Sequence, residues 1–303
     1  MGHGDGSFVP KGEQMGITKE CSVCFRHCKI SEGGLGFCGA RGVKDGEVYA
    51  LNYGRITSLA LDPIEKKPLK RFHPRSKILS VGSYGCNLRC PFCQNSSISW
   101  GDEVPEYRER AEYLSPEELA AAALHYRDRG NIGVAFTYNE PFVGYEYVRD
   151  TAKLVHELGM YNVMVTNGTA ELSVYSELAL YIDAMNIDLK GFTEQYYKDL
   201  LNGDLGVVKA MITEAVKHCH VELTTLIIPG ENDSEEEMRE MCAWISELKD
   251  ADGNPIGRNV PLHVSRFHPC FHMTDRRSTD VAKVYRLAEV AREKLKYVYT
   301  GNC

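Results

Sequence analysis

Short runs of β-branched and apolar residues alternate with segments of helical period from residue 78 onward. The apolar runs lie at residues 78–82, 132–138, 160–166, 182–189, 221–228 and 260–266. Their length and composition are typical of buried strands. The segments of helical period cover residues 115–129, 145–158, 170–180, 206–219, 234–249 and 279–296.

One helix start is marked with particular clarity. Ser115 is a suitable N-cap, Pro116 occupies the first helical position, and Glu118 completes a capping box. Gly130 is the expected stop. Strands that alternate with helices predict right-handed βαβ units and a parallel sheet. Six such units favour an α/β fold with a partial (β/α)6 barrel over an eightfold one.

Polar residues follow each predicted strand. The segments are Gly85-Cys86-Asn87-Leu88-Arg89-Cys90, Tyr138-Asn139-Glu140-Pro141, Thr166-Asn167-Gly168, Asp188-Leu189-Lys190-Gly191, Pro229-Gly230-Glu231-Asn232-Asp233 and Arg266-Phe267-His268-Pro269. Parallel barrels place their active sites at the carboxyl ends of the strands. Many of these residue types also simply form turns, but Glu140, Lys190 and His268 are not turn formers. The pattern predicts an active site at this rim.

Composition and charge narrow the class of protein. The chain has 303 residues, a formal net charge of −7, 43% hydrophobic and 25% charged residues, which is the balance of a soluble globular protein and disfavours a strongly basic nucleic-acid binder. Residues 1–15 are Gly-rich and polar, without the apolar core of a signal peptide. No run approaches the length of a membrane span. We therefore expect a cytoplasmic protein with reduced thiols and no membrane partner.

Residues 65–77 form a basic run, with Phe72 as the sole aromatic residue within it. Its cations are Lys66, Lys67, Lys70, Arg71, Arg75 and Lys77. A phosphate-rich partner is one interpretation, but base stacking would require more aromatic side chains. Charge pairing with the barrel rim or with an acidic partner is the simpler interpretation. The composition changes near this run, so we expect a Cys-rich module with a basic linker at 1–75 and the barrel at 76–303.

Eleven cysteines are unusual for this length, and seven of them fall into two groups. The first group is Cys21, Cys24, Cys28 and Cys38, with glycines between them that allow the chain to turn back. Four thiols in so short a segment favour a closed site for zinc or a second iron–sulfur cluster, which would stabilise a module too small for a large core. Reduced, unligated cysteines are the alternative.

The second group, Cys86, Cys90 and Cys93, has the spacing C-x3-C-x2-C. Iron–sulfur clusters normally have four cysteine ligands. Three thiolates would leave one iron open to another molecule, much as catalytic zinc keeps an open position. A zinc site is the alternative, although it would require a fourth protein ligand. Cys219 and Cys242 lie in helical segments and are expected to be small core residues.

This triad, with Phe92 before its last cysteine and at the end of the first strand of a six-unit barrel, resembles the radical S-adenosylmethionine (SAM) superfamily. The resemblance implies that Cys86, Cys90 and Cys93 hold a [4Fe-4S] cluster whose open iron is chelated by SAM, and that Phe92 lies near the adenine. The segment Thr137-Tyr138-Asn139-Glu140-Pro141 stands where that family has Gly-Gly-Glu, with both glycines absent. Asn139 and Glu140 are then expected to contact the SAM amino group.

Further segments resemble the activating enzymes of glycyl-radical enzymes, namely Thr166-Asn167-Gly168, Asp188-Leu189-Lys190 and Ile228-Pro229-Gly230. The resemblance implies that Thr166, Asn167, Asp188 and Lys190 also lie at the cofactor, and that His268 contacts SAM or substrate. Those activases have an Asp before Thr-Asn-Gly that helps to hold a monovalent cation. Val165 stands there in this chain, so the resemblance leaves the cation site open, with Asp188 as its remaining candidate residue. We interpret Cys270 and His272 as packing residues.

Nearly the whole chain is similar to the radical SAM enzymes of the AmmeMemoRadiSam system. The segments that carry this similarity are Cys21-x2-Cys24-x3-Cys28-x9-Cys38-Gly39-Ala40-Arg41, Asp62-Pro63-Ile64-Glu65-Lys66-Lys67-Pro68-Leu69, the triad, Thr137-Tyr138-Asn139-Glu140-Pro141 and Tyr297-Val298-Tyr299-Thr300-Gly301-Asn302. The resemblance leaves the substrate open.

The implied activity is reductive cleavage of SAM to methionine and a 5′-deoxyadenosyl radical that abstracts hydrogen from a substrate. An external one-electron donor of the flavodoxin or ferredoxin type would be its partner. One alternative is an activase that acts on a glycine of a protein. A second is a non-enzymatic iron–sulfur or zinc scaffold or redox sensor.

Overall fold

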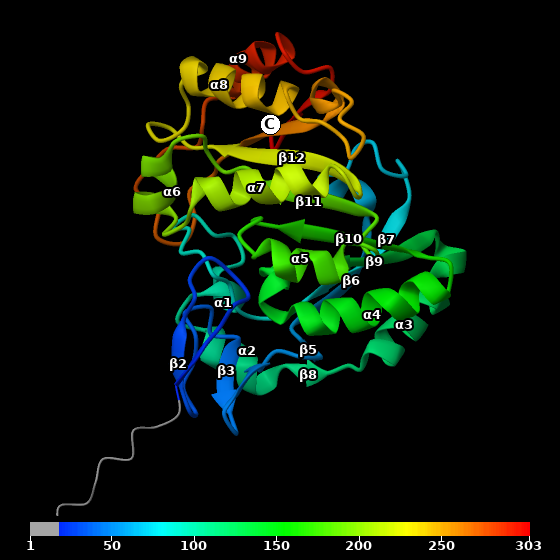
Figure 1. Cartoon of the computed structure of the whole chain (residues 1–303). Helices are drawn as coiled ribbons and strands as arrows, with labels where there is room; N and C mark the ends of the chain where they lie inside the picture. Colours follow the sequence, from blue (N-terminus) through cyan, green and yellow to red (C-terminus); the bar gives the residue numbers. More distant parts are fainter. Residues whose placement is uncertain (1–17) are drawn as a thin grey trace, which may run out of the picture.

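The computed structural model describes residues 18–303 (Figure 1). Residues 1–15, where the sequence predicts no signal peptide, lie outside the described residues. One eight-stranded sheet dominates the fold, with the strand order β14-β13-β12-β11-β10-β9-β7-β6. Its strands are β6 (Ser58–Pro63), β7 (Lys77–Gly82), β9 (Asn131–Phe136), β10 (Tyr161–Thr166), β11 (Ala184–Asp188), β12 (His220–Ile227), β13 (Leu262–Arg266) and β14 (Val298–Gly301).

All six predicted strands are confirmed, as β7 and β9 to β13. Each pairs in parallel with its neighbour, so the predicted α/β architecture with a partial barrel is confirmed. Two edge strands were not predicted. β14 adds a further parallel strand next to β13, and β6 pairs antiparallel with β7.

Helices connect the parallel strands and cover the outside of the sheet, as Figure 1 shows for α4, α5 and α7. They are α1 (Ser96–Ser99), α2 (Val104–Arg110), α3 (Pro116–His125), α4 (Tyr145–Glu157), α5 (Leu172–Leu178), α6 (Glu194–Leu200), α7 (Leu205–Ala215), α8 (Glu235–Ser246) and α9 (Val281–Arg292). The capping box of α3 is confirmed, because Ser115 Oγ accepts from the Glu118 N–H and the Glu118 carboxylate accepts from the Ser115 N–H. The helix ends through a 3-10 turn at Gly130, which has φ +88°.

Side chains alternate along the strands between a helix-covered face and the barrel interior. In β11, Met185 and Ile187 belong to the main apolar core. The intervening Asn186 is fully buried, and its amide donates to Pro68 O inside the barrel. In β12, the fully buried Glu222 likewise belongs to this polar interior. The barrel interior therefore holds polar groups together with a small apolar cluster, while the main apolar core lies between the sheet and its helices.

The cysteine-rich residues form two small hairpins, shown in blue beside α1 and α2 in Figure 1. One pairs β1 (Thr18–Glu20) with β2 (Lys29–Ser31), and the other pairs β3 (Arg41–Lys44) with β4 (Glu47–Ala50). A third short ladder joins β5 (Arg55–Ile56) to β8 (Glu112–Tyr113). The hairpins are tied to the barrel, since the Glu171 N–H donates to Val23 O.

The predicted boundary at residue 75 falls after β6, which is a strand of the barrel sheet. The division into 1–75 and 76–303 stays a prediction. No helix within residues 18–303 has the length and apolar character needed to cross a membrane.

Residues 64–71, which we call the plug, run from the end of β6 across the barrel interior. The plug begins with a 3-10 helix (Ile64–Lys66). Ile64 and Leu69 are fully buried against Ile78 and Val163 on the inner side of the strands. At its far end the Arg71 guanidinium lies 3.8 Å from the ring centroid of Tyr297, just before β14. The plug therefore bridges the two edges of the open sheet.

Candidate functional site

One cleft of about 610 Å³ opens at the carboxyl ends of the strands and extends into the barrel. It collects the predicted cluster ligands and all of the predicted cofactor contacts except His268. Those lining it are Cys86, Cys90, Phe92, Cys93, Asn139, Glu140, Thr166, Asn167, Asp188 and Lys190. These side chains come from loops after β7, β9, β10 and β11, and they converge because parallel strands end at the same rim.

The loop that carries the cysteine triad is held by main-chain contacts on several sides. The Cys86 N–H donates to Cys38 O at 3.2 Å, and the Arg89 N–H donates to Leu201 O at 2.9 Å. Gly85 has φ +95°, and a Cβ there would lie 2.6 Å from the Cβ of Ala40. Only glycine fits this entry to the loop.

Burial of the three thiols changes their pKa values. Desolvation raises the pKa of Cys86 well above its usual value and that of Cys90 to about 12, and it also raises the pKa of Cys93. Without a cation, thiols in this environment hold their protons. A bound metal centre reverses this preference, because coordinating thiols are deprotonated. The site fits a cationic cluster better than a set of free thiolates.

Glu140 is buried, with 2% of its surface exposed, and lies between two strand ends. Its carboxylate accepts from Thr166 Oγ1 at 2.7 Å, from the Asn167 N–H at 2.8 Å and from the Phe142 N–H at 3.1 Å. Desolvation outweighs these hydrogen bonds and raises the pKa of Glu140 to about 7. A cationic ligand group beside this carboxylate would favour its charged form.

Asn139 is hydrogen-bonded chiefly to the main chain around the start of the cysteine loop. Its amide nitrogen lies 3.1 Å from Gly85 O and 3.2 Å from Tyr84 O, and its Oδ1 accepts from the Ser83 N–H at 3.0 Å. In this arrangement Asn139 positions the loop. Its expected contact with the SAM amino group stays a prediction.

Asp188 and Lys190 form an ion pair at the end of β11, with 2.6 Å between Oδ2 and Nζ. Burial disfavours the Lys190 charge, but Asp188 and Cys90 raise the pKa of Lys190 above its usual value. Asn232, which the sequence reasoning treated only as a turn residue, donates to Lys190 O at 2.7 Å. The turn after β12 therefore fixes the segment that carries the pair.

His268 is the one predicted cofactor contact that is not among the lining residues of the cleft. Its ring nitrogens lie 3.1 Å from Ser278 Oγ and 3.3 Å from Asn302 O, and Asn302 does line the cleft. The following residues pack on the cysteine loop, since Cys270 Sγ lies 3.1 Å from Phe92 O and the His272 N–H donates to Pro91 O.

Cys21, Cys24, Cys28 and Cys38 line one small cavity of the amino-terminal hairpins. Burial raises the pKa of Cys24 and raises that of Cys38 to about 11. Within residues 18–303, no three or more Cys, His, Asp or Glu side chains are arranged around a single ion position. A metal at the four cysteines therefore stays a prediction. The triad of Cys86, Cys90 and Cys93 does not require a shared ion position, because each cysteine ligand of a [4Fe-4S] cluster binds a different iron atom.

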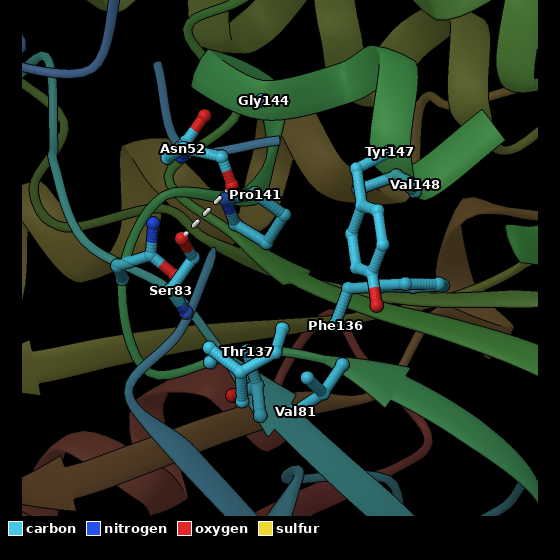
Figure 2. Close-up of a pocket in the computed structure, with 12 residues that line it drawn as sticks. Asn52, Val81, Ser83, Phe136, Thr137, Pro141, Gly144, Tyr147 and Val148 are labelled. Carbon is cyan, nitrogen blue, oxygen red and sulfur yellow. Dashed lines mark hydrogen bonds between the residues drawn. The ribbon is translucent and has the colours of Figure 1, made fainter. Parts of the chain in front are cut away.

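A second cavity lies behind the rim and is shown in Figure 2. Asn52, Ser83, Pro141 and Tyr147 are among its lining residues, and the dashed line marks the contact of Ser83 Oγ with Asn52 O. Its volume of about 30 Å³ suits a water molecule rather than a cofactor. Within residues 18–303, neither the Tyr147 hydroxyl nor Asn52 Oδ1 has a hydrogen-bond partner, so both are suitable partners for such a water.

Sequence reasoning missed three residues that also line the main cleft, namely Lys66, Lys70 and His263. The two lysines belong to the basic run, for which the sequence favoured charge pairing with the barrel rim or with an acidic partner. His263 lies in the middle of a predicted strand, where the alternation of β13 could have assigned it to the barrel interior.

The chain is similar to known proteins in its sequence and in its fold. The family model described as the radical SAM superfamily matches residues 80–242. An uncharacterized protein of Methanocaldococcus jannaschii is 40% identical over 93% of this chain and 80% of its own length. The pyruvate formate-lyase-activating enzyme of Clostridium pasteurianum is 25% identical over 70% of this chain and 89% of its own. A solved radical SAM methyltransferase from Sphaerobacter thermophilus has the same fold, with TM-score 0.54 and 17% identity over 76% of this chain and 67% of that one.

Proposed function

Because the chain belongs to the radical SAM superfamily and is an enzyme of that family, we propose that it cleaves SAM at a [4Fe-4S] cluster held by Cys86, Cys90 and Cys93. When bound, the cluster would supply the electron for cleavage of SAM to methionine and a 5′-deoxyadenosyl radical, which would abstract hydrogen from a substrate. The observation that carries the proposal is the convergence of the three cysteines and Glu140 on one cleft.

The protein's own groups would bind and orient SAM. Glu140, oriented by Thr166 and the Asn167 N–H, would accept from the SAM amino group. Phe92 would lie along the adenine. The Asp188–Lys190 ion pair would make polar contacts with SAM at the same rim. His268, whose Nε2 lies near Asn302 O, would contact SAM or substrate from that side of the cleft.

Radical chemistry also requires that water and stray hydrogen donors are excluded, and the barrel interior would provide this exclusion. Apolar Leu226 and Val165 line the interior of the cleft beside the polar groups. An external one-electron donor of the flavodoxin or ferredoxin type would reduce the cluster. A cytoplasmic location is part of this proposal, because the ligand thiols must stay reduced.

Anaerobic reconstitution of the full chain tests the proposal through the Cys90→Ala variant, with Cys303→Ala as the matched control at an exposed thiol. We expect dithionite-reduced wild-type protein and the control to convert SAM to 5′-deoxyadenosine. Cys90→Ala should lose both the cluster spectrum and this conversion. Retained cleavage in Cys90→Ala would contradict the assignment. Wild-type protein that binds iron but never cleaves SAM would favour the redox-sensor alternative.

A second candidate function is activation of a glycyl-radical enzyme, which the similarity to the Clostridium pasteurianum activating enzyme favours. Its substrate would be a glycine in a protein loop. Electron paramagnetic resonance separates the candidates, because only this function produces a glycyl radical on a cognate protein incubated with the reduced enzyme and SAM.

The amino-terminal cysteines enter the proposal as a closed site for zinc or a second cluster. The chemistry of the donor set supports this, since four cysteines line one cavity. Iron, sulfide and zinc analysis of wild-type protein against a Cys21→Ser and Cys24→Ser double variant decides between zinc, a cluster and no metal.

A further inference from the structure

The main cleft extends past the cysteine loop to a floor formed by the plug. Pro68 and Lys70 of the plug line the cleft, together with His263 and Ser265 of β13. Buried barrel groups hold this floor in place. Asn186 donates to Pro68 O at 2.9 Å, and Glu222 accepts from the N–H groups of Lys70 and Arg71 at 3.0 and 2.7 Å.

The carboxylates of the cleft are already engaged by donors. Glu140 accepts three hydrogen bonds, and Asp188 is paired with Lys190. Glu65 accepts from the Arg75 N–H at 2.7 Å. Glu222 accepts from four donors, namely His220, His263 and the two plug amides. Hydrogen bonds from neutral groups leave Glu222 charged, but within residues 18–303 none of these acids forms an ion pair with the Lys70 ammonium.

The cations of the plug exceed the acids available to them. Asp62 serves both Lys66 and Lys67, at 3.3 and 3.0 Å. In the part of the chain that the structure describes, no carboxylate pairs with the Lys70 ammonium. Lys70 therefore brings to the lining of the cleft a cation that has no carboxylate partner among residues 18–303.

His263 supplies an independent, buried group at the same place. Only 5% of its surface is exposed, its Nε2 lies 2.7 Å from Glu222, and its ring stacks near Tyr299. Within residues 18–303 its Nδ1 has no hydrogen-bond partner, while the residue lines the cleft. Since Nε2 donates to the Glu222 carboxylate, Nδ1 can donate to an anionic ligand when the ring is an imidazolium.

We propose that Lys70 and His263 form a binding site for the anionic group, a carboxylate or a phosphate, of a small-molecule substrate. The inference rests on the proposed function, because it assigns the deep end of the cleft in which SAM would bind. The plug supports a small substrate, since it closes the barrel from below where a passing peptide would need space. An anion between the two would accept from the Lys70 ammonium and from the Nδ1–H of the His263 imidazolium.

The test titrates inorganic phosphate and, separately, acetate into the anaerobically reconstituted full chain with SAM bound. Binding is followed by calorimetry. Wild-type protein is compared with Lys70→Ala and His263→Gln. Lys44→Ala, at an exposed position on β3, removes the same charge outside the cleft. We expect at least one anion to bind wild-type protein and Lys44→Ala alike, and the anion that binds identifies the group. Each floor variant should weaken that binding by about fivefold or more, the loss of one charge-assisted hydrogen bond.

Several outcomes would overturn the inference. These are failure of both anions to bind wild-type protein, unchanged binding in Lys70→Ala, or equal weakening in Lys44→Ala. Lys70→Ala keeps the main-chain contacts of the plug, so it tests the charge even if His263→Gln disturbs folding. Formation of 5′-deoxyadenosine is measured on the same wild-type samples. SAM cleavage without anion binding contradicts only this inference, whereas anion binding without SAM cleavage contradicts only the proposed function.

Discussion

The Cys86 N–H and the Cys38 carbonyl oxygen form a hydrogen bond of 3.2 Å, so the first cysteine of the triad is anchored to the last cysteine of the amino-terminal group. Arg89 strengthens the same junction, because its guanidinium lies 3.7 Å from the ring centroid of Phe37 and donates to Phe37 O. The amino-terminal hairpins thus support the loop that would hold the cluster.

This junction predicts that Cys38→Ser affects the barrel as well as the hairpins. Loss of the Cys38 thiol should lower the metal content of the amino-terminal site and slow SAM cleavage several-fold, because the carbonyl that anchors Cys86 is then held less firmly. The measurements are metal analysis and the rate of 5′-deoxyadenosine formation. Cys303→Ser is the control. Unchanged metal content together with an unchanged rate would exclude a metal-dependent support.

Glu140 predicts a specific pH dependence of stability. Its pKa of about 7 exceeds the ordinary value of 4.5, so the native state binds more protons than the unfolded state between these values. Stability therefore falls as pH rises through this window. Since glutamine does not titrate, Glu140→Gln should gain up to a few kcal/mol relative to wild-type protein between pH 5 and pH 8.

The measurement for Glu140 is urea unfolding of metal-free protein at several pH values. Glu247→Gln, at the exposed end of α8, serves as the control. Parallel stability curves for wild-type protein and Glu140→Gln would show that the carboxylate does not titrate in this range.

Glu222→Gln should loosen the plug. Although burial opposes its ionisation, hydrogen bonds from His220 and His263 lower the pKa of Glu222 to about 2. The glutamine amide cannot accept from four donors, so we expect a loss of about 2 kcal/mol. Hydrogen exchange at the amides of Lys70 and Arg71 should accelerate.

The matched control for this variant is Glu214→Gln. Glu214 also accepts from two basic side chains, Lys217 and His218, but on the surface of α7. Hydrogen exchange at the plug amides should be as slow in Glu214→Gln as in wild-type protein. Equal protection of the plug amides in Glu222→Gln would be inconsistent with the role assigned to this carboxylate.

Asp62→Asn should destabilise the start of the plug. Lys67 is only 3% exposed, and its ammonium lies 3.0 Å from Asp62, which also accepts from the Tyr138 hydroxyl at 2.8 Å. Removal of the carboxylate leaves a buried cation without its counter-charge, at a cost of about 3 kcal/mol. Chemical denaturation measures the loss.

Acid pH should reproduce part of this effect. Burial opposes ionisation of Asp62, but Lys67 and Tyr138 lower its pKa to about 2. The stabilisation is present above the ordinary value of 3.8 and is lost as pH falls through 2.

The control for Asp62→Asn is Glu106→Gln, which breaks an exposed ion pair with Arg110 and should cost less than about 1 kcal/mol. Similar losses in both variants would mean that the Asp62 pair behaves as a surface pair.

The sequence by itself determined the repeating strand and helix units and the chemistry at their ends. Apolar runs such as residues 182–189 and the Ser115 capping box are local signals, because the residue pattern of a strand and the start of a helix depend on nearby residues. The spacing of Cys86, Cys90 and Cys93 within one loop is likewise local, and so their position together at one cleft could be predicted.

Tertiary structure decided what depends on distant segments. β14 is a short strand that is recognisable only through its pairing with β13, and the plug looks like a charged linker until Glu222 and Asn186 hold it inside the barrel. The hydrogen bond between Cys38 and Cys86, and the approach of Lys70 to the cleft beside His263, also arise from chain closure. Side chains far apart in sequence meet only when the sheet curves, and no local periodicity records that curvature.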